Sequence, residues 1–193
     1  MLDEKDHKPR RNYELRPPKP EDGISVSRLI SACPPLDENS LYCNLLQCSH
    51  FAQTCALAEH RGGIDGFVSG YIPPGQPDTL FIWQVAVAAA GRGQGLAKRL
   101  IRHILERPVC RNVRFLDTTI TSDNRASWAM FEGLARTLDA PTTTRVMFDR
   151  EAHFDGRHAS EHLLRIGPFD VAAAHQSTRV ANESERSEPR TAS

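Results

Sequence analysis

The sequence predicts a mixed α/β (α+β) domain, with a central mixed β-sheet of about six or seven strands flanked by about four helices. Residues 79–88 are almost continuously apolar, which is typical of a strand buried on both faces. A glycine-rich turn follows at 91–95, and the apolar residues after it fall on one face of a helix over about 94–106. Shorter strand and helix patterns lie on both sides of this strand–turn–helix segment.

Prolines and capping residues delimit the other expected elements. Pro34 must end the first helix, because proline cannot continue one. Asn39 or Ser40 can cap the second helix, and Asp123 or Asn124 can cap the last one. In chain order, these other elements are strand 13–16, helices from about 20 and 41, strands 55–60, 64–72 and 113–120, a helix from about 125, and strands 145–148 and 162–166.

The patterned region predicts one domain with two loose ends. No segment between 13 and 170 is rich enough in Pro, Gly or Ser to act as a linker, so this range is one domain. Residues 1–12 are mostly charged or polar, and residues 171–193 lack apolar periodicity. We therefore expect disordered tails at 1–12, including Arg11 as part of a solvated segment, and at 171–193.

Composition and charge exclude several classes of protein. Lys and Arg number 24, as do Asp and Glu, which argues against a general nucleic-acid binder. No apolar run is long enough for a membrane helix, and the first residues do not resemble a secretory signal. The five cysteines include no CxxC pair, so we expect reduced and mostly buried thiols. These features predict a soluble cytoplasmic protein without a membrane partner.

The glycine-rich turn has the features of an anion site. Free backbone N–H groups and the positive end of a helix dipole would point at one spot there, which suits a phosphate or pyrophosphate. The spacing does not match the Walker loop, because no hydroxyl residue follows Lys98. It does not match the dinucleotide fingerprint either, because Leu96 stands where the third glycine would be.

The segment Arg92-x-x-Gly95-x-Ala97 resembles the pyrophosphate-binding signature of the GCN5-related N-acetyltransferases, the GNAT family. This resemblance implies the GNAT fold and acetyl-CoA as co-substrate, without a metal. It also implies that backbone groups of the central strand line the pantetheine arm and that a later Asn-x-x-Ser segment contacts the cofactor. The implied cofactor-binding residues are Val85, Ala86, Val87, Arg92, Gly93, Gln94, Gly95, Leu96, Ala97, Asn124 and Ser127.

Further segments resemble one GNAT subfamily, the L-2,4-diaminobutyrate acetyltransferases of ectoine biosynthesis. They are LRPPKPEDG (15–23), LDENSLYCNLLQCSHF (36–51), FIWQVAV (81–87), TTITSDNRASWAMFEGLAR (118–136) and EAHFDGRHASEHLLRIGP (151–168). The resemblance implies acetyl transfer to the 4-amino group of L-2,4-diaminobutyrate by a homodimer. Asp37, Tyr42, Trp83 and Glu161 match its acceptor pocket, with Tyr42 and Glu161 as the candidate catalytic residues.

The same four residues also have plain structural interpretations. Asp37 can cap a helix, Tyr42 and Trp83 can be core residues, and Glu161 can be an exposed strand residue. Phe131 occupies the position where many relatives have a proton-donating tyrosine, and phenylalanine cannot donate a proton. Two other functions therefore stay open: acetylation of another small amine such as a polyamine, or acetyl-CoA binding by a non-catalytic sensor.

Overall fold

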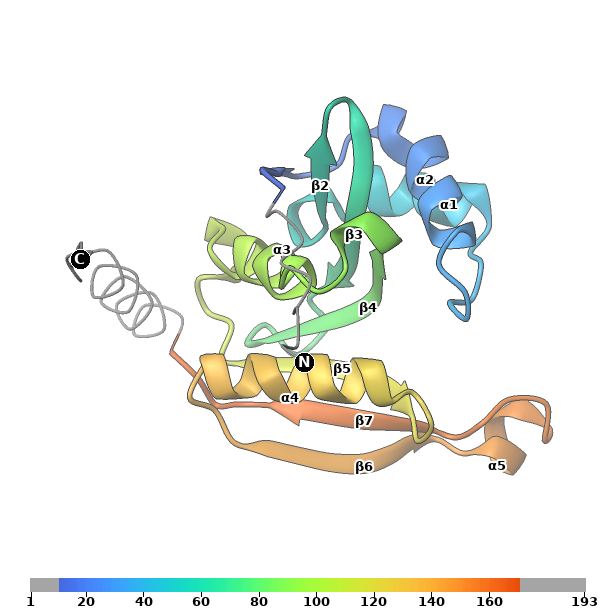
Figure 1. The fold of residues 1–193 in the computed structure, drawn as a ribbon. Helices are drawn as coiled ribbons and strands as arrows, with labels where there is room; N and C mark the ends of the chain where they lie inside the picture. Colours follow the sequence, from blue (N-terminus) through green and yellow to red (C-terminus); the bar gives the residue numbers. More distant parts are fainter. Residues whose placement is uncertain (1–10, 171–193) are drawn as a thin grey trace, which may run out of the picture. The chain divides into compact units, whose positions relative to one another are not determined.

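The computed structural model describes residues 11–170, which contain seven strands and five α-helices (Figure 1). The predictions for residues 1–10 and 171–193 lie outside the described residues. The sheet is mixed, with strand order β1-β2-β3-β4-β5-β7-β6, and the predicted fold class is confirmed. The elements are β1 Glu14–Arg16, α1 Gly23–Ser31, α2 Leu41–Ser49, β2 Ala56–His60, β3 Gly63–Tyr71, β4 Thr79–Val87, α3 Leu96–Leu105, β5 Phe115–Thr121, α4 Arg125–Thr137, β6 Thr142–Phe148, α5 Arg150–Phe154 and β7 Glu161–Ile166.

The described residues divide into two compact units. The first contains 11–70 and 84–104, and the second contains 71–83 and 105–170. The boundary runs through β4, so the first half of this strand belongs to the second unit and its last residues belong to the first. We describe each unit by itself.

The first unit is built on antiparallel strands and a helix pair. β1 pairs with β2, and β2 pairs with β3. The turn between β2 and β3 is Arg61-Gly62, with positive φ at both residues, as a two-residue hairpin turn requires. One apolar cluster joins α1, α2 and the strands through Val26, Leu29, Ile30, Cys33, Cys48, Cys55, Leu57, Phe67 and Ala86.

The second unit combines parallel and antiparallel pairing. β4 runs parallel to β5, whereas β7 pairs antiparallel with both β5 and β6. Helix α4 lies along β5 and β7 (Figure 1) and buries Phe131, Leu134 and Ala135. Leu164 and Ile166 of β7 are buried as well. Strand β6 is exposed along almost its whole length.

Two helices differ from the sequence-based expectations. Helix α5 was not expected, because five residues are too few for a periodic pattern; Asp149 caps it by accepting hydrogen bonds from Glu151 N and Ala152 N at 2.9 and 3.1 Å. Helix α2 exposes Leu41 and Tyr42 and buries Asn44 and Gln47. Its packing thus departs from the apolar pattern of its sequence.

The N-terminal boundary also carries contacts. Arg11, which was expected in a solvated tail, forms an ion pair with Asp65 at 3.0 Å. The Arg11 backbone N–H also donates to Gln94 Oε1 at 2.9 Å. Asn12 O lies 2.9 Å from the His60 ring nitrogen Nδ1. The ordered contacts of the first unit therefore include residues 11 and 12.

Two further findings bear on the class of protein. None of the helices within residues 11–170 is long and apolar enough to cross a membrane. All five cysteines are free thiols, and four of them are buried. Burial raises the pKa of both the Cys48 and the Cys110 thiols to about 11, so these groups stay protonated at neutral pH.

Candidate functional site

The loop between β4 and α3 depends on two glycines in left-handed backbone. Gly93 has φ +77° and Gly95 has φ +68°, values that L side chains rarely adopt. A Cβ atom added at either position would meet nothing within 4 Å, so open space lies beside both. The glycines therefore shape the loop and leave room for a ligand to approach its backbone.

Helix α3 begins directly after this loop with amide groups that the helix itself does not use. The hydrogen bond from Arg99 N to Gly95 O, at 3.1 Å, closes its first turn. The amides of Leu96, Ala97 and Lys98 precede this bond and have no intrahelical acceptor. Together with the helix dipole and the charge of Lys98, they form a site suited to an anion.

Side chains of the loop fasten it to neighbouring backbone. Gln94 Nε2 donates to Ala90 O at 2.9 Å, while its Oε1 accepts from Arg11 N. Arg92 Nε donates to Val87 O at 3.1 Å. Arg92 and Gln94 therefore hold the glycine loop against the end of β4. In this way the first unit brings the predicted residues 85–87 and 92–97 together.

The last residues of β4 divide between core and surface. Ala86 is completely buried within the apolar cluster, whereas Val85 and Val87 are half-buried. The Ala86 side chain is therefore committed to the core, and only its backbone can serve a ligand. Val87 O accepts from both Arg92 Nε and the Cys33 thiol, the latter at 3.4 Å.

Gln84 was missed by the sequence analysis and determines where the α1–α2 loop lies. Its side chain is 8% exposed. Nε2 donates to Asp37 O at 2.8 Å, and Oε1 accepts from Asn39 Nδ2 at 2.9 Å. The signal in the sequence is a single amide inside the apolar run FIWQVAV, two positions from the apolar residues Ile82 and Ala86 and therefore on the same face of the strand.

The structure excludes the plain structural interpretations of three acceptor-pocket candidates. Ser40 Oγ caps α2 by accepting from Cys43 N at 3.1 Å, so Asp37 is not the cap of this helix. Tyr42 is 71% exposed and is therefore not a core residue. Trp83 is 49% exposed, with its ring edge-on to Tyr71 at 6.4 Å between centroids, which also excludes plain core packing.

The remaining predicted residues lie on α4 and β7 of the second unit. Asn124 Oδ1 accepts from Ser127 N at 3.1 Å and thereby caps α4. This bond uses the oxygen of the amide, and Nδ2 is the donor that a ligand would meet. Glu161 is the first residue of β7 and is half-buried, opposite Thr121 and Phe148. Phe131 is 3% exposed, on the inward face of α4.

The histidines within the described part of the chain do not assemble a metal site. Across residues 11–170, no group of three or more His, Cys, Asp or Glu side chains could hold a metal ion. His153 Nδ1 instead accepts from Asp149 N at 2.9 Å, within helix α5 and its cap.

The sequence matches the acetyltransferase (GNAT) family over residues 24–135, a range that includes β4, the glycine loop, α3 and most of α4. The chain belongs to the GNAT family. Membership of this family explains why the left-handed glycines Gly93 and Gly95 lie directly before the unpaired amides at the start of α3. The same combination is the one that the signature at 92–97 predicted.

Similar proteins of the GNAT family include diaminobutyrate acetyltransferases. The chain is 53% identical to the L-2,4-diaminobutyric acid acetyltransferase of Methylotuvimicrobium alcaliphilum over 160 residues, which cover 83% of this chain and 93% of the relative. It is 47% identical to the protein of the same name from Halomonas elongata, over 81% of this chain and 82% of that protein.

Solved structures of other proteins share the fold of this chain. The diaminobutyrate acetyltransferase EctA from Paenibacillus lautus, in complex with its substrate L-2,4-diaminobutyric acid and coenzyme A, is 41% identical to this chain. It superposes with a TM-score of 0.78, covering 82% of this chain and 96% of that one. The NatC complex bound to Gag peptide and CoA, at 16% identity and a TM-score of 0.64, shares the fold.

Proposed function

We propose that this chain transfers the acetyl group of acetyl-CoA to the 4-amino group of L-2,4-diaminobutyrate, giving N4-acetyl-L-2,4-diaminobutyrate for ectoine biosynthesis. One observation carries the proposal: 41% identity, over 82% of the chain, to an acetyltransferase whose structure holds both diaminobutyric acid and coenzyme A. The glycine loop and the start of α3 supply the matching cofactor geometry in this chain.

On the cofactor side, the residues present fit acetyl-CoA, which supplies an acetyl group activated as a thioester. The loop residues Arg92, Gly93, Gln94, Gly95, Leu96 and Ala97 would hold the pyrophosphate through backbone N–H groups. Backbone groups of Val85, Ala86 and Val87 would lie along the pantetheine arm. Asn124 would donate from Nδ2, and Ser127 would contribute its hydroxyl. The open space beside Gly93 and Gly95 supports this assignment.

On the acceptor side, two carboxylates suit the two ammonium groups of a diamino acid. We assign Asp37 to one ammonium group and Glu161 to the amine that reacts. That amine must lose a proton before it can attack, because an ammonium has no lone pair, and Glu161 would accept this proton. Tyr42 would position the amine by a hydrogen bond, and Trp83 would lie against the aliphatic chain. The exposure of Tyr42 and Trp83 supports these roles.

We place the protein in the cytoplasm, in agreement with its free thiols. We also propose a homodimer, which the exposed apolar side chains Ile24, Leu41 and Phe51 of the first unit support.

The test is an amine panel with acetyl-CoA, followed by location of the acetyl group on the product by NMR. We expect L-2,4-diaminobutyrate to be preferred over ornithine, lysine and spermidine, with acetylation at the 4-amino group. Preference for spermidine would instead identify a polyamine acetyltransferase. Binding of acetyl-CoA without turnover of any amine would identify a sensor, the alternative that the buried Phe131 favours, because it cannot protonate a leaving thiolate.

A further inference from the structure

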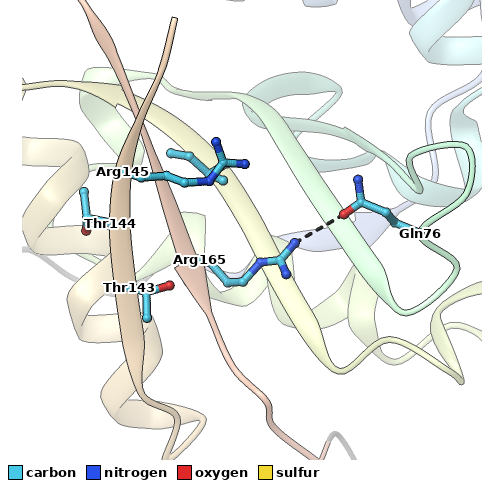
Figure 2. A pocket seen from close by; sticks show the side chains of 6 residues that line it. Gln76, Thr143, Thr144, Arg145 and Arg165 are labelled. Atoms are coloured by element: carbon cyan, nitrogen blue, oxygen red, sulfur yellow. Dashed lines mark hydrogen bonds between the residues drawn. The ribbon is translucent and has the colours of Figure 1, made fainter.

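A hollow lies on the sheet of the second unit, and none of the residues that line it has a role in the acetyl transfer proposed above. It has a volume of about 440 Å³ and is lined by Gln76, Thr143, Thr144, Arg145, Leu163 and Arg165. Figure 2 shows the two arginine side chains extending from neighbouring strands over the same region. Its lining is polar apart from Leu163, and it contains two cations and no acidic side chain.

Arg165 is fixed in place by three neighbours. Its Nε and Nη2 donate to the two carboxylate oxygens of Asp117 at 2.8 and 2.7 Å. Nη2 also donates to Gln76 Oε1 at 3.3 Å, the contact dashed in Figure 2. The guanidinium lies over the Phe115 ring, 5.0 Å from its centroid. These contacts use Nε and Nη2, so Nη1 keeps its donors for another acceptor.

No opposite charge pairs with the Arg145 guanidinium in this hollow. Within residues 11–170 its guanidinium has neither a hydrogen bond nor an ion pair. β6 and β7 pair with Thr143 opposite Arg165 and Arg145 opposite Leu163. Because side chains two residues apart share a face, Arg145 and Arg165 are diagonal neighbours on one face of the sheet. Asp117 already pairs with Arg165, and the more distant Asp78 acts on Arg165 only through space.

We infer that this hollow binds a small oxyanion, with a carboxylate or phosphate group held between Arg145 and Arg165. Guanidinium groups match the geometry of both oxyanions and hold them by charge-assisted hydrogen bonds. The Thr143 hydroxyl and the Gln76 amide add neutral donors at the edge. An anion there would also supply the counter-charge that Arg145 lacks in the hollow. This inference does not depend on acetyl transfer.

The experiment is isothermal titration calorimetry on the full chain, with inorganic phosphate and with succinate as probes. Saturating CoA is present throughout, so that the glycine loop is already filled. We expect saturable binding of at least one probe, and Arg145→Gln should weaken it about tenfold, the usual value of one charge-assisted hydrogen bond. The matched control is Arg136→Gln on the exposed side of α4, which removes the same charge and should leave the affinity unchanged.

The possible results either support the anion site or overturn it. Tighter binding of phosphate than of succinate, or the reverse, supports the site and identifies the group it prefers. Absence of saturable binding overturns the inference, as does an Arg145→Gln variant with native affinity. A change of oligomeric state in Arg145→Gln, with no change in anion affinity, also overturns it and would make this face an interface between copies. CoA affinity measured on both variants verifies that the fold is intact.

Discussion

At the scale of single residues, the cofactor loop is most sensitive at Gly95. Its backbone is left-handed, and the space beside it is open. Substitution there has two separate consequences: strain from the positive φ, and a side chain placed where the anion should lie. Gly75 permits these consequences to be separated, because it also has positive φ, at +82°, and nothing within 4 Å of an added Cβ.

We predict that Gly95→Glu abolishes measurable acetyl-CoA binding, whereas Gly75→Glu leaves it unchanged. Both variants pay a similar backbone strain, about 1 kcal/mol or more, so their melting temperatures should fall together. Only Gly95→Glu adds a negative charge beside the α3 amides. Calorimetry with acetyl-CoA and thermal denaturation of both variants provide the measurements. Equal affinities in the two variants would contradict the assignment of the loop.

At the scale of elements, Gln84 connects the central strand to the loop between α1 and α2. Its two hydrogen bonds join residues that are 47 and 45 positions apart in the chain. The contact orients the backbone at Asp37, the residue proposed to hold an ammonium group of the acceptor. Gln84 therefore acts as a positioning residue for the acceptor side.

We predict that Gln84→Leu raises the KM for diaminobutyrate severalfold while the KM for acetyl-CoA stays unchanged. Loss of two neutral hydrogen bonds should also lower the free energy of unfolding by about 1–3 kcal/mol. The matched control is Gln47→Leu. Gln47 is also buried, but among the described residues its Oε1 has no partner, and its Nε2 donates only to Cys43 Sγ at 3.8 Å.

The control variant should change stability little, since it removes the desolvation cost of an amide oxygen without a partner and loses only one weak hydrogen bond to sulfur. Steady-state kinetics for both substrates and urea denaturation check the pair. If the KM for acetyl-CoA rises as much as the KM for the amine, Gln84 supports the strand in general and not the acceptor loop.

At the scale of the whole molecule, a chain without net charge forms several partly buried ion pairs among its described residues. Arg16 of β1 contacts both Asp22 and Glu59, at 2.8 and 2.9 Å. It thereby fastens β1, the turn before α1 and β2 to one another. The hydrogen bonds from Arg16 hold the pKa of Asp22 below its usual value, and the bond from Lys19 N acts in the same direction.

We predict that Asp22→Asn lowers the free energy of unfolding at pH 7 by about 1.5–3 kcal/mol, the usual value of hydrogen bonds to a charged group. Because the pKa of Asp22 is lower in the folded state, its stabilisation is present above the unfolded pKa of about 4 and disappears as the pH falls through the folded value. The difference between Asp22→Asn and the unaltered chain should therefore shrink below about pH 4.

Asp155→Asn is the control for this experiment, because Asp155 forms only an exposed pair with Arg157 and has positive φ, which asparagine tolerates. It should change stability little at any pH. Denaturant titrations from pH 3 to pH 7 measure both variants. A difference for Asp22→Asn that does not vary with pH would show that the carboxylate charge is not what stabilises this contact.

Sequence alone determined the features that depend on near neighbours. The glycine turn before α3 and the narrowing of two helix caps to adjacent pairs are local, because each needs only a few neighbouring residues and the conformation they prefer. Within those pairs, the structure has Ser40 and Asn124 as the caps. The family signature is local as well, so acetyl-CoA and the order of most elements could be predicted. The acceptor was predicted from resemblance and not from the chemistry of single residues.

Tertiary structure alone decided what depends on residues far apart. Helix α2 turns Asn44 and Gln47 inward although its leucines are apolar, because the burial of a helix face is set by what packs against it. The contact of Gln84 with Asp37 and the pairing of Asp117 with Arg165 each join residues more than 40 positions apart. Strand β7 lies between β5 and β6, and that order brings Arg145 beside Arg165. No local preference encodes such pairings, since their energy comes from contacts that exist only in the folded chain.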